Sequence, residues 1–253
     1  MQAKPSHTPK KTSTIDADDV ARFSRIADEW WDEQGKFKPL HRINPLRIGY
    51  IRDKVCAHFA RPQSGDALLG LSLLDIGCGG GLISEPMTRL GAQVSGVDAS
   101  AKNIAVAKLH AEKMGLSIHY RANSAEALAE QSEQYDVVLA LEIVEHVANI
   151  PLFLTSLAQL VKPDGLLIMS TLNRTAKSYA LAIIGAEYIL RWLPRGTHQW
   201  QQFVRPSELV RGLSEHGLET QHITGMVMHP LSQKWRLSPD DLSVNYLLCA
   251  TKN

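Results

Sequence analysis

A glycine-rich turn is the first of two groups of residues whose types and spacing could do chemistry. The run Asp75-Ile-Gly77-Cys-Gly79-Gly-Gly81 follows an apolar segment, and the next apolar segment ends at Asp98. Glycines at such a turn permit positive φ and let a ligand touch the backbone. A carboxylate about 20 residues later can accept hydrogen bonds from the hydroxyls of a ribose. The spacing therefore predicts a site for an adenosine compound.

The residues around this turn indicate which adenosine compound it binds. Asp75 lies just before the first glycine, where its carboxylate would repel a pyrophosphate but attract the ammonium and sulfonium groups of S-adenosylmethionine. Leu82 occupies the position at which a dinucleotide-binding turn has Gly or Ala. Both observations favour S-adenosylmethionine over NAD. A glycine turn that serves packing alone is the remaining alternative.

The second group is the cluster Glu142-Ile-Val-Glu145-His146, which follows the apolar segment 135–141. Two carboxylates and an imidazole are ligands that suit a hard or borderline divalent cation. In the alternative interpretation, Glu142 and Glu145 favour the positive end of a following helix, and His146 lies in a hydrogen-bonded turn. The residues themselves leave both interpretations open.

Short apolar segments alternate with helical patterns from residue 71 onward, which predicts an α/β fold with a doubly wound, mainly parallel, seven-stranded sheet. The expected strands are 71–75, 93–98, 118–121, 135–141, 165–171, 219–224 and 244–251. The expected helices are 82–90, 101–114, 124–131, 150–161 and 206–216. Ligands of such sheets bind beyond the carboxyl ends of the strands, so the glycine turn, Asp98, Ser124, Leu141 and His146 should share one rim.

Three segments are expected along the chain. Residues 1–14 are polar and read as a disordered tail. Residues 15–62 form an N-terminal helical lid, with one helix capped by Asp16 and a second helix over 50–59. The proline-containing stretch 37–50 between them is expected to be a loop that covers the site. Residues 63–253 form the α/β domain.

An insertion at 174–204 within this domain is far longer than the usual connection. The apolar stretch within this insertion is shorter than the ~20 residues that span a bilayer. The insertion also carries Arg191, Arg195, Tyr188 and Trp192. Basic and aromatic side chains of this kind favour lipid headgroups, so residues 178–194 are expected to lie on a membrane surface. An ordinary buried helix or a dimer contact is the alternative.

Composition excludes some classes of function. The formal net charge is +1, and there is no global positive field that would favour nucleic acid. The three cysteines, Cys56, Cys78 and Cys249, form no CxxC pair, which favours a reducing cytoplasm over a disulfide framework.

The glycine turn, Asp98 and the run Leu160-Val-Lys-Pro-Asp-Gly165 together resemble class I methyltransferases across residues 71–171. A narrower resemblance, to the ubiquinone biosynthesis O-methyltransferase family, extends over residues 15–250. It is carried by Lys38-Pro-Leu-His-Arg-Ile-Asn-Pro-Leu-Arg47, Glu142-Ile-Val-Glu145-His146, Ser170-Thr-Leu-Asn-Arg174, Gly185-Ala-Glu-Tyr-Ile-Leu190 and Gly196-Thr-His198. The resemblance implies S-adenosylmethionine-dependent O-methylation of polyprenyl catechol and demethylubiquinol intermediates, at both O-methylation steps.

The resemblance also implies roles for individual residues. Arg47 contacts the methionine carboxylate, Gly77 lies beneath the donor, Asp98 holds the ribose, and Leu141 backs the donor. The expected donor-binding set is Arg47, Asp75, Gly77, Gly79, Asp98, Ala99, Ser124 and Leu141. The expected catalytic set is Glu142, Glu145 and His146, which would also hold Mg²⁺ or another divalent cation. The phenol proton would pass to His146, or to His41 or His198.

Expected partners are a polyprenylated phenol or quinol, a membrane surface contacted through 178–194, and other ubiquinone-biosynthesis proteins, with no nucleic acid. The expected location is the cytoplasm, peripherally on the inner membrane. Two alternatives remain: a methyltransferase for another small molecule or for tRNA, and a catalytically silent lipid-binding module on the same scaffold.

Overall fold

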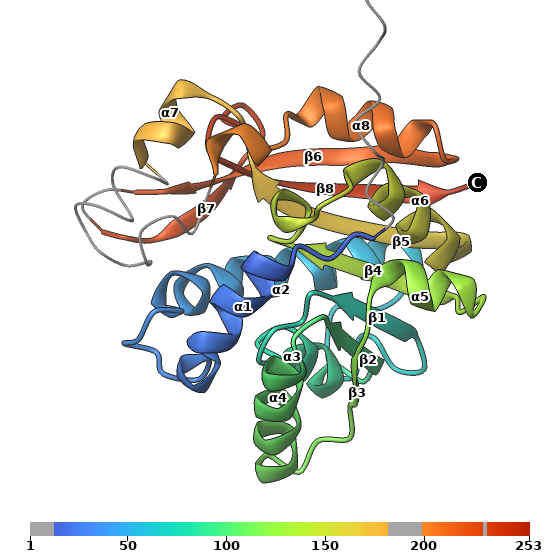
Figure 1. The fold of residues 1–253 in the computed structure, drawn as a ribbon. Helices are drawn as coiled ribbons and strands as arrows, with labels where there is room; N and C mark the ends of the chain where they lie inside the picture. Colours follow the sequence, from blue (N-terminus) through green and yellow to red (C-terminus); the bar gives the residue numbers. More distant parts are fainter. Residues whose placement is uncertain (1–12, 182–198, 230–231) are drawn as a thin grey trace, which may run out of the picture.

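An eight-stranded sheet forms the centre of the protein (Figure 1), whose computed structural model describes residues 13–181, 199–229 and 232–253. The strand order is β3-β2-β1-β4-β5-β8-β6-β7. Strands β1 to β5 pair in parallel, whereas β8 is antiparallel to both β5 and β6, and β7 is antiparallel to β6. The predicted α/β class is confirmed, and the eighth strand is an addition to the predicted seven.

The strands are β1 Ser72–Ile76, β2 Gln93–Asp98, β3 His119–Ala122, β4 Tyr135–Leu141, β5 Val161–Leu172, β6 Leu218–Met228, β7 Trp235–Ser238 and β8 Asn245–Lys252. The α-helices are α1 Ala17–Arg25, α2 Lys38–His58, α3 Ser84–Arg89, α4 Ala101–Lys113, α5 Ala125–Glu130, α6 Ile150–Leu160, α7 Ala176–Ser178 and α8 Pro206–Ser214. Short 3-10 turns are η1 Ala27–Glu29, η2 Val144–His146 and η4 Trp200–Gln202. The unpredicted β7 is a four-residue edge strand that pairs only with β6 in the described sheet.

Each face of the sheet packs against its own set of helices. Buried side chains of α5, α6 and α8, such as Leu128, Phe153 and Leu213, join strand residues in one apolar cluster. Buried side chains of α2 and α3, such as Ile51 and Met87, join strand residues in a second cluster. Because both faces are covered, the central strands β1 and β4 are buried along nearly their whole length.

Helix α2 corrects the prediction of a loop over 37–50. The helix runs unbroken from Lys38 to His58, with Pro39 in its first turn, where a missing N–H costs nothing, and Pro45 inside it. An interior proline disfavours a helix by about 3 kcal/mol. Ile43, Tyr50 and other side chains along one face of α2 are buried in the second cluster, and this burial offsets that cost.

The N-terminal boundary also differs from the prediction. Ser13 and Thr14, assigned to the tail, donate hydrogen bonds from their hydroxyls to the carboxylate of Glu126 at 2.9 and 2.5 Å. Asp16 caps α1 as predicted, because its side chain accepts from the N–H groups of Asp18 and Asp19. Residues 1–12 and 182–198 lie outside the described residues, and with them most of the expected tail and most of the insertion. Within the described part of the chain, no helix is long and apolar enough to cross a membrane.

Candidate active site

A cavity of about 720 Å³ opens at the carboxyl ends of β1, β2 and β4. Every residue of the predicted donor-binding set lines it: Arg47, Asp75, Gly77, Gly79, Asp98, Ala99, Ser124 and Leu141. Residues of the N-terminal segment, including Asp19, Phe23 and Trp30, line the same cavity. Parallel strands thus gather residues that are far apart in the chain at one rim of the sheet, as expected.

The glycine turn after β1 has the left-handed conformation that its sequence predicts. Gly77 has φ of +75°, and its N–H donates to the carbonyl of Val97 at 2.7 Å. A Cβ atom at Gly77 would lie 2.4 Å from Cδ1 of Ile143, so a side chain would meet both backbone strain and a neighbour. Gly77 and Gly79 of this turn line the cavity, where the absence of side chains lets neighbouring groups approach the backbone closely.

Asp75, at the end of β1, is a buried carboxyl beside this turn. Its Oδ2 accepts a hydrogen bond from the hydroxyl of Ser84 at 2.6 Å, and the residue is 3% exposed. Burial raises the pKa of Asp75 to about 6, and the neighbouring carboxylate of Asp98 acts in the same direction. A cationic ligand in the cavity would favour the charged form of Asp75, which agrees with the ammonium and sulfonium groups of S-adenosylmethionine.

Asp98 ends β2 and is held by three donors of the protein. Its Oδ1 accepts from the N–H of Ser100 at 2.8 Å and from Nδ2 of Asn103 at 3.1 Å, while its Oδ2 accepts from the N–H of Gly79 at 3.0 Å. Burial raises the pKa of Asp98, and these hydrogen bonds oppose that shift. Since a carboxylate has about four acceptor positions, about one remains on Oδ2 for a ribose hydroxyl.

Arg47 reaches the cavity from α2 and is 3% exposed. Its Nη2 forms an ion pair with Oε1 of Glu142 at 2.6 Å, and the hydroxyl of Ser170 donates to the same oxygen at 2.8 Å. Nε of Arg47 is buried with no hydrogen-bond partner among the described residues. A buried guanidinium N–H without a partner is costly, so the site fits a ligand that brings a carboxylate to Arg47.

The cluster after β4 does not gather around one point. Glu142 is paired with Arg47, Glu145 accepts a hydrogen bond from the hydroxyl of Thr171 at 2.8 Å, and Nδ1 of His146 lies 2.8 Å from Oδ2 of Asp19. Glu142 and His146 line the cavity, whereas Glu145 is not among the described residues that do. No group of three or more His, Cys, Asp or Glu side chains among the described residues could hold a metal ion. The predicted metal ligands are therefore adjacent in sequence but are not arranged as a ligand set.

Sequence reasoning missed Asp19, although it lines the cavity and is paired with His146. Its position in the first turn of α1 indicates only a favourable charge at a helix N-terminus, so no local signal could have identified it. Of the two other candidate bases, His41 has its Nε2 2.9 Å from the carbonyl of Trp30 and is not among the described lining residues, and His198 lies outside the described residues.

Comparisons with known proteins identify the kind of domain that this chain forms. A family model described as a methyltransferase domain matches residues 47–223. The fold is similar to that of magnesium protoporphyrin IX methyltransferase from Synechocystis PCC 6803, solved with bound SAH, at a TM-score of 0.65 and 20% identity over 94% of this chain and 95% of that chain. The matching family model and the fold together define a class I S-adenosylmethionine-dependent methyltransferase.

Curated relatives narrow this class. Proteins named ubiquinone biosynthesis O-methyltransferase are 56% identical in Chelativorans sp. (strain BNC1), over 96% of both chains, and 53% identical in Bradyrhizobium diazoefficiens, over 99% of this chain and 98% of that one. A third, from Rhizobium etli, is 56% identical over 95% of this chain and 97% of its own. The chain belongs to the ubiquinone biosynthesis O-methyltransferase family.

Proposed function

We propose that this protein transfers the methyl group of S-adenosylmethionine to ring hydroxyls of polyprenyl catechol and demethylubiquinol intermediates, at both O-methylation steps of ubiquinone biosynthesis. The observation that carries the proposal is the single cavity that collects Arg47, Asp75, the glycine turn and Asp98 in a chain with full-length relatives of this name. No observation favours a tRNA acceptor or a catalytically silent module.

The donor would be held along the rim of the sheet. The guanidinium of Arg47 would bind the methionine carboxylate, and Asp75 would attract the ammonium and sulfonium charges. Gly77 would lie beneath the donor, and Asp98 would accept a hydrogen bond from the ribose. Ala99, Ser124 and Leu141 would contact the rest of the molecule. When bound, the donor supplies an electrophilic methyl group on a sulfonium.

The protein's contribution to transfer is to place the acceptor oxygen in line with the methyl group and to take its proton. His146 lies at the cavity wall, and Asp19 engages its Nδ1. A carboxylate at Nδ1 fixes the ring orientation and stabilises the imidazolium that forms when Nε2 accepts the phenol proton. As the oxygen–carbon bond forms, the carbon–sulfur bond breaks and its electron pair stays on sulfur, giving a neutral thioether.

Glu142, Glu145 and His146 each contact a different partner and do not form a ligand set for a divalent cation in this structure. The cation predicted from the resemblance is tested directly by measuring turnover in EDTA and after Mg²⁺ is restored. Turnover that is lost in EDTA and returns with Mg²⁺ would support the cation.

We propose further that the protein works in the cytoplasm, peripherally bound to the inner membrane, because a polyprenylated acceptor partitions into lipid. The segment 178–194 assigned to this contact lies mostly outside the described residues. Loss of liposome flotation on deleting 178–194 supports the contact, and unchanged flotation removes it. Co-purification of the protein with other ubiquinone-biosynthesis proteins tests the remaining expected partners.

The direct test of function is incubation of the purified protein with methyl-labelled S-adenosylmethionine and a short-chain polyprenyl catechol in detergent micelles. A labelled methyl ether is expected. Label in added tRNA but not in the catechol would favour the second acceptor class, and donor binding without transfer to any acceptor would favour the silent module.

A further inference from the structure

Trp30 belongs to the N-terminal segment that precedes α2, and it packs against the glycine turn on the wall of the cavity. Its indole is 7% exposed and stacks on Phe37, with ring centroids 3.7 Å apart and planes at 9°. A Cβ atom at Gly79 or Gly80 would lie 2.3 or 2.4 Å from this indole. The two glycines therefore let the tryptophan pack directly on the backbone of the donor-binding turn.

The same indole makes a hydrogen bond that leads to Asp98. Nε1 of Trp30 donates to Oδ1 of Asn103 at 3.0 Å, and Nδ2 of Asn103 donates to Oδ1 of Asp98 at 3.1 Å. Asn103 is 2% exposed, so both hydrogen bonds lie away from bulk water. An amide that accepts from the indole on one side must present its NH₂ group on the other, which directs that group at the carboxylate.

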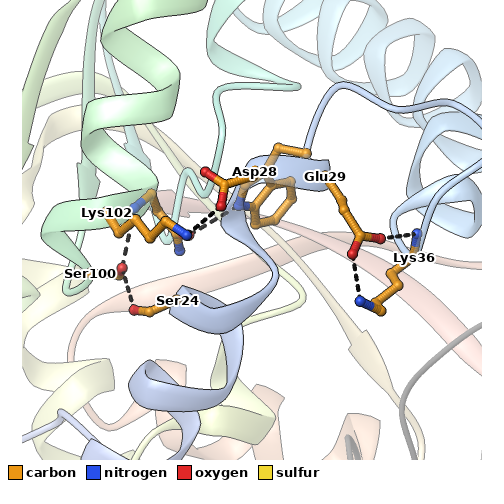
Figure 2. Close-up of polar contacts among 8 residues, drawn as sticks. Ser24, Asp28, Glu29, Lys36, Ser100 and Lys102 are labelled. Carbon is orange, nitrogen blue, oxygen red and sulfur yellow. Dashed lines mark hydrogen bonds and ion pairs between the residues drawn. The ribbon is translucent and has the colours of Figure 1, made fainter.

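A second contact joins the N-terminal segment to the same part of the chain. The hydroxyls of Ser24 and Ser100 are 2.6 Å apart, and Figure 2 shows this pair beside the ion pair of Asp28 with Lys102. Ser100 caps α4, and its N–H donates to Oδ1 of Asp98. Both protein donors on Oδ1 thus belong to residues that the N-terminal segment contacts.

We infer that Trp30 and Asn103 are positioning residues that fix the carboxylate of Asp98 for the donor's ribose. The inference rests on the proposed role of Asp98. With Oδ1 occupied by Ser100 and Asn103, the plane of the carboxylate is set and Oδ2 is directed to the remaining acceptor position. Without the indole hydrogen bond, the Asn103 amide can rotate, and Asp98 loses one of its three protein donors and is held less firmly. Affinity for the donor therefore depends on the N-terminal segment.

Trp30→Phe tests this inference because it removes the indole N–H while keeping an aromatic ring on Phe37. Loss of one buried hydrogen bond should weaken S-adenosylhomocysteine binding about fivefold in calorimetry. The KM for S-adenosylmethionine should rise in parallel with this loss of affinity, because the inference places the effect on donor binding. Trp200→Phe is the matched control, because its Nε1 donates to the carbonyl of Thr175 at 2.9 Å and it is not among the described cavity-lining residues.

A double-mutant cycle separates positioning from direct contact or packing. If Trp30 acts through Asn103, Trp30→Phe introduced into Asn103→Ala should change donor affinity less than twofold further. If Trp30→Phe weakens donor binding equally in the parent protein and in Asn103→Ala, the inference is overturned. The 2′,3′-dideoxy analogue of S-adenosylhomocysteine should bind the parent protein and Trp30→Phe alike, whereas a fivefold difference with this analogue would overturn the role of the ribose contact.

Asp98→Asn distinguishes failure of this inference from failure of the function on which it rests. Unchanged donor affinity in Asp98→Asn would remove the proposed ribose contact itself. Weakened affinity in Asp98→Asn together with unchanged affinity in Trp30→Phe would remove only the positioning by Trp30. Thermal melts of all variants confirm that folded proteins are compared.

Discussion

The donor rim, formed by Gly77, Gly79 and Asp98, lines the same cavity as Glu142 and His146 of the cluster after β4, yet the two regions are built in different ways. At the rim, Gly79, Ser100 and Asn103 hold Asp98 from nearby positions in the chain. After β4, the partners are distant: Glu142 is held by Arg47, and His146 by Asp19. A local motif therefore supplies the direct donors to Asp98, and Trp30 acts on them only through Asn103, whereas the second region depends directly on how separate segments pack together.

The backbone of the two regions shows the same contrast. The positive φ angles of the donor turn fall on glycines, which adopt them without steric strain, so the sequence itself indicates the turn. Glu142 has φ of +50°, an uncommon conformation for a residue with a side chain. Ion pairing with Arg47 and the hydrogen bond from Ser170 hold Glu142 in this conformation. Only the structure reveals that constraint.

The largest effect is expected at His146. If this ring takes the phenol proton with Asp19 orienting it, His146→Gln should lower the turnover number by about 10²-fold or more, with donor affinity unchanged. Asp19→Asn should lower turnover less. Glu145→Gln is the matched control from the same turn, because Gln can still accept from Thr171, and its turnover should stay within about threefold of the parent's. Equal losses in Glu145→Gln and His146→Gln, both sensitive to a chelator, would instead favour a shared metal site.

The next largest effect is expected from breaking the ion pair between Arg47 of α2 and Glu142 of the cluster after β4. Arg47→Gln leaves the Glu142 carboxylate without its cation, and removing one partner of a buried pair should lower the free energy of unfolding by about 3 kcal/mol. Adding Glu142→Gln should restore most of this stability but not the donor affinity. Denaturant unfolding and calorimetry measure the two quantities. Recovery of donor affinity in the double variant would show that Arg47 does not bind the donor.

Residues with local partners or repeated patterns were the predictable part of the molecule. Alternating apolar segments indicated the sheet, and the glycine turn indicated Gly77 and Asp98, whereas the role of Arg47 was expected from the family resemblance. The continuous helix α2 was missed because burial of Ile43 and Tyr50 outweighs the local effect of Pro45. The pairing of Asp19 with His146 could not be predicted, because residues in α1 and η2 meet only through the fold.

A pH-dependent change in the free energy of unfolding, similar in size to that of Arg47→Gln, is expected from Asp75. Its pKa is about 6 in the folded protein against an ordinary 3.8, so the neutral form stabilises the fold fully below about pH 4, and this stabilisation is lost as pH rises through 6. At pH 7.5 the loss is about 3 kcal/mol. Asp75→Asn should recover up to that amount in denaturant unfolding without donor, and the gain should vanish near pH 4. A pH-independent gain would contradict a buried charge at this residue.

The same substitution should have the opposite effect on donor binding. Without the Asp75 carboxylate, the donor's ammonium and sulfonium groups lose their attraction, so calorimetry at pH 7.5 should show weaker binding. Tighter or unchanged binding would mean that Asp75 only supports the turn through Ser84. If Asp75→Asn stabilises the fold and weakens donor binding, the Asp75 carboxylate serves ligand binding rather than folding.

The smallest effect, at Gly77, shows how closely the donor rim packs against the cluster after β4. Gly77 and Gly217 both have φ of +75°, but a Cβ atom at Gly77 would meet Ile143, whereas one at Gly217 would have nothing within 4 Å. Gly217→Ala should therefore cost only the backbone strain, about 1 kcal/mol, and Gly77→Ala about 1 kcal/mol more. When Gly77→Ala and Gly217→Ala are each introduced into Ile143→Ala, the two substitutions should cost the same free energy of unfolding relative to Ile143→Ala alone. If Gly77→Ala still costs more than Gly217→Ala in the Ile143→Ala background, the backbone of the turn itself, and not contact with Ile143, disfavours a side chain at residue 77.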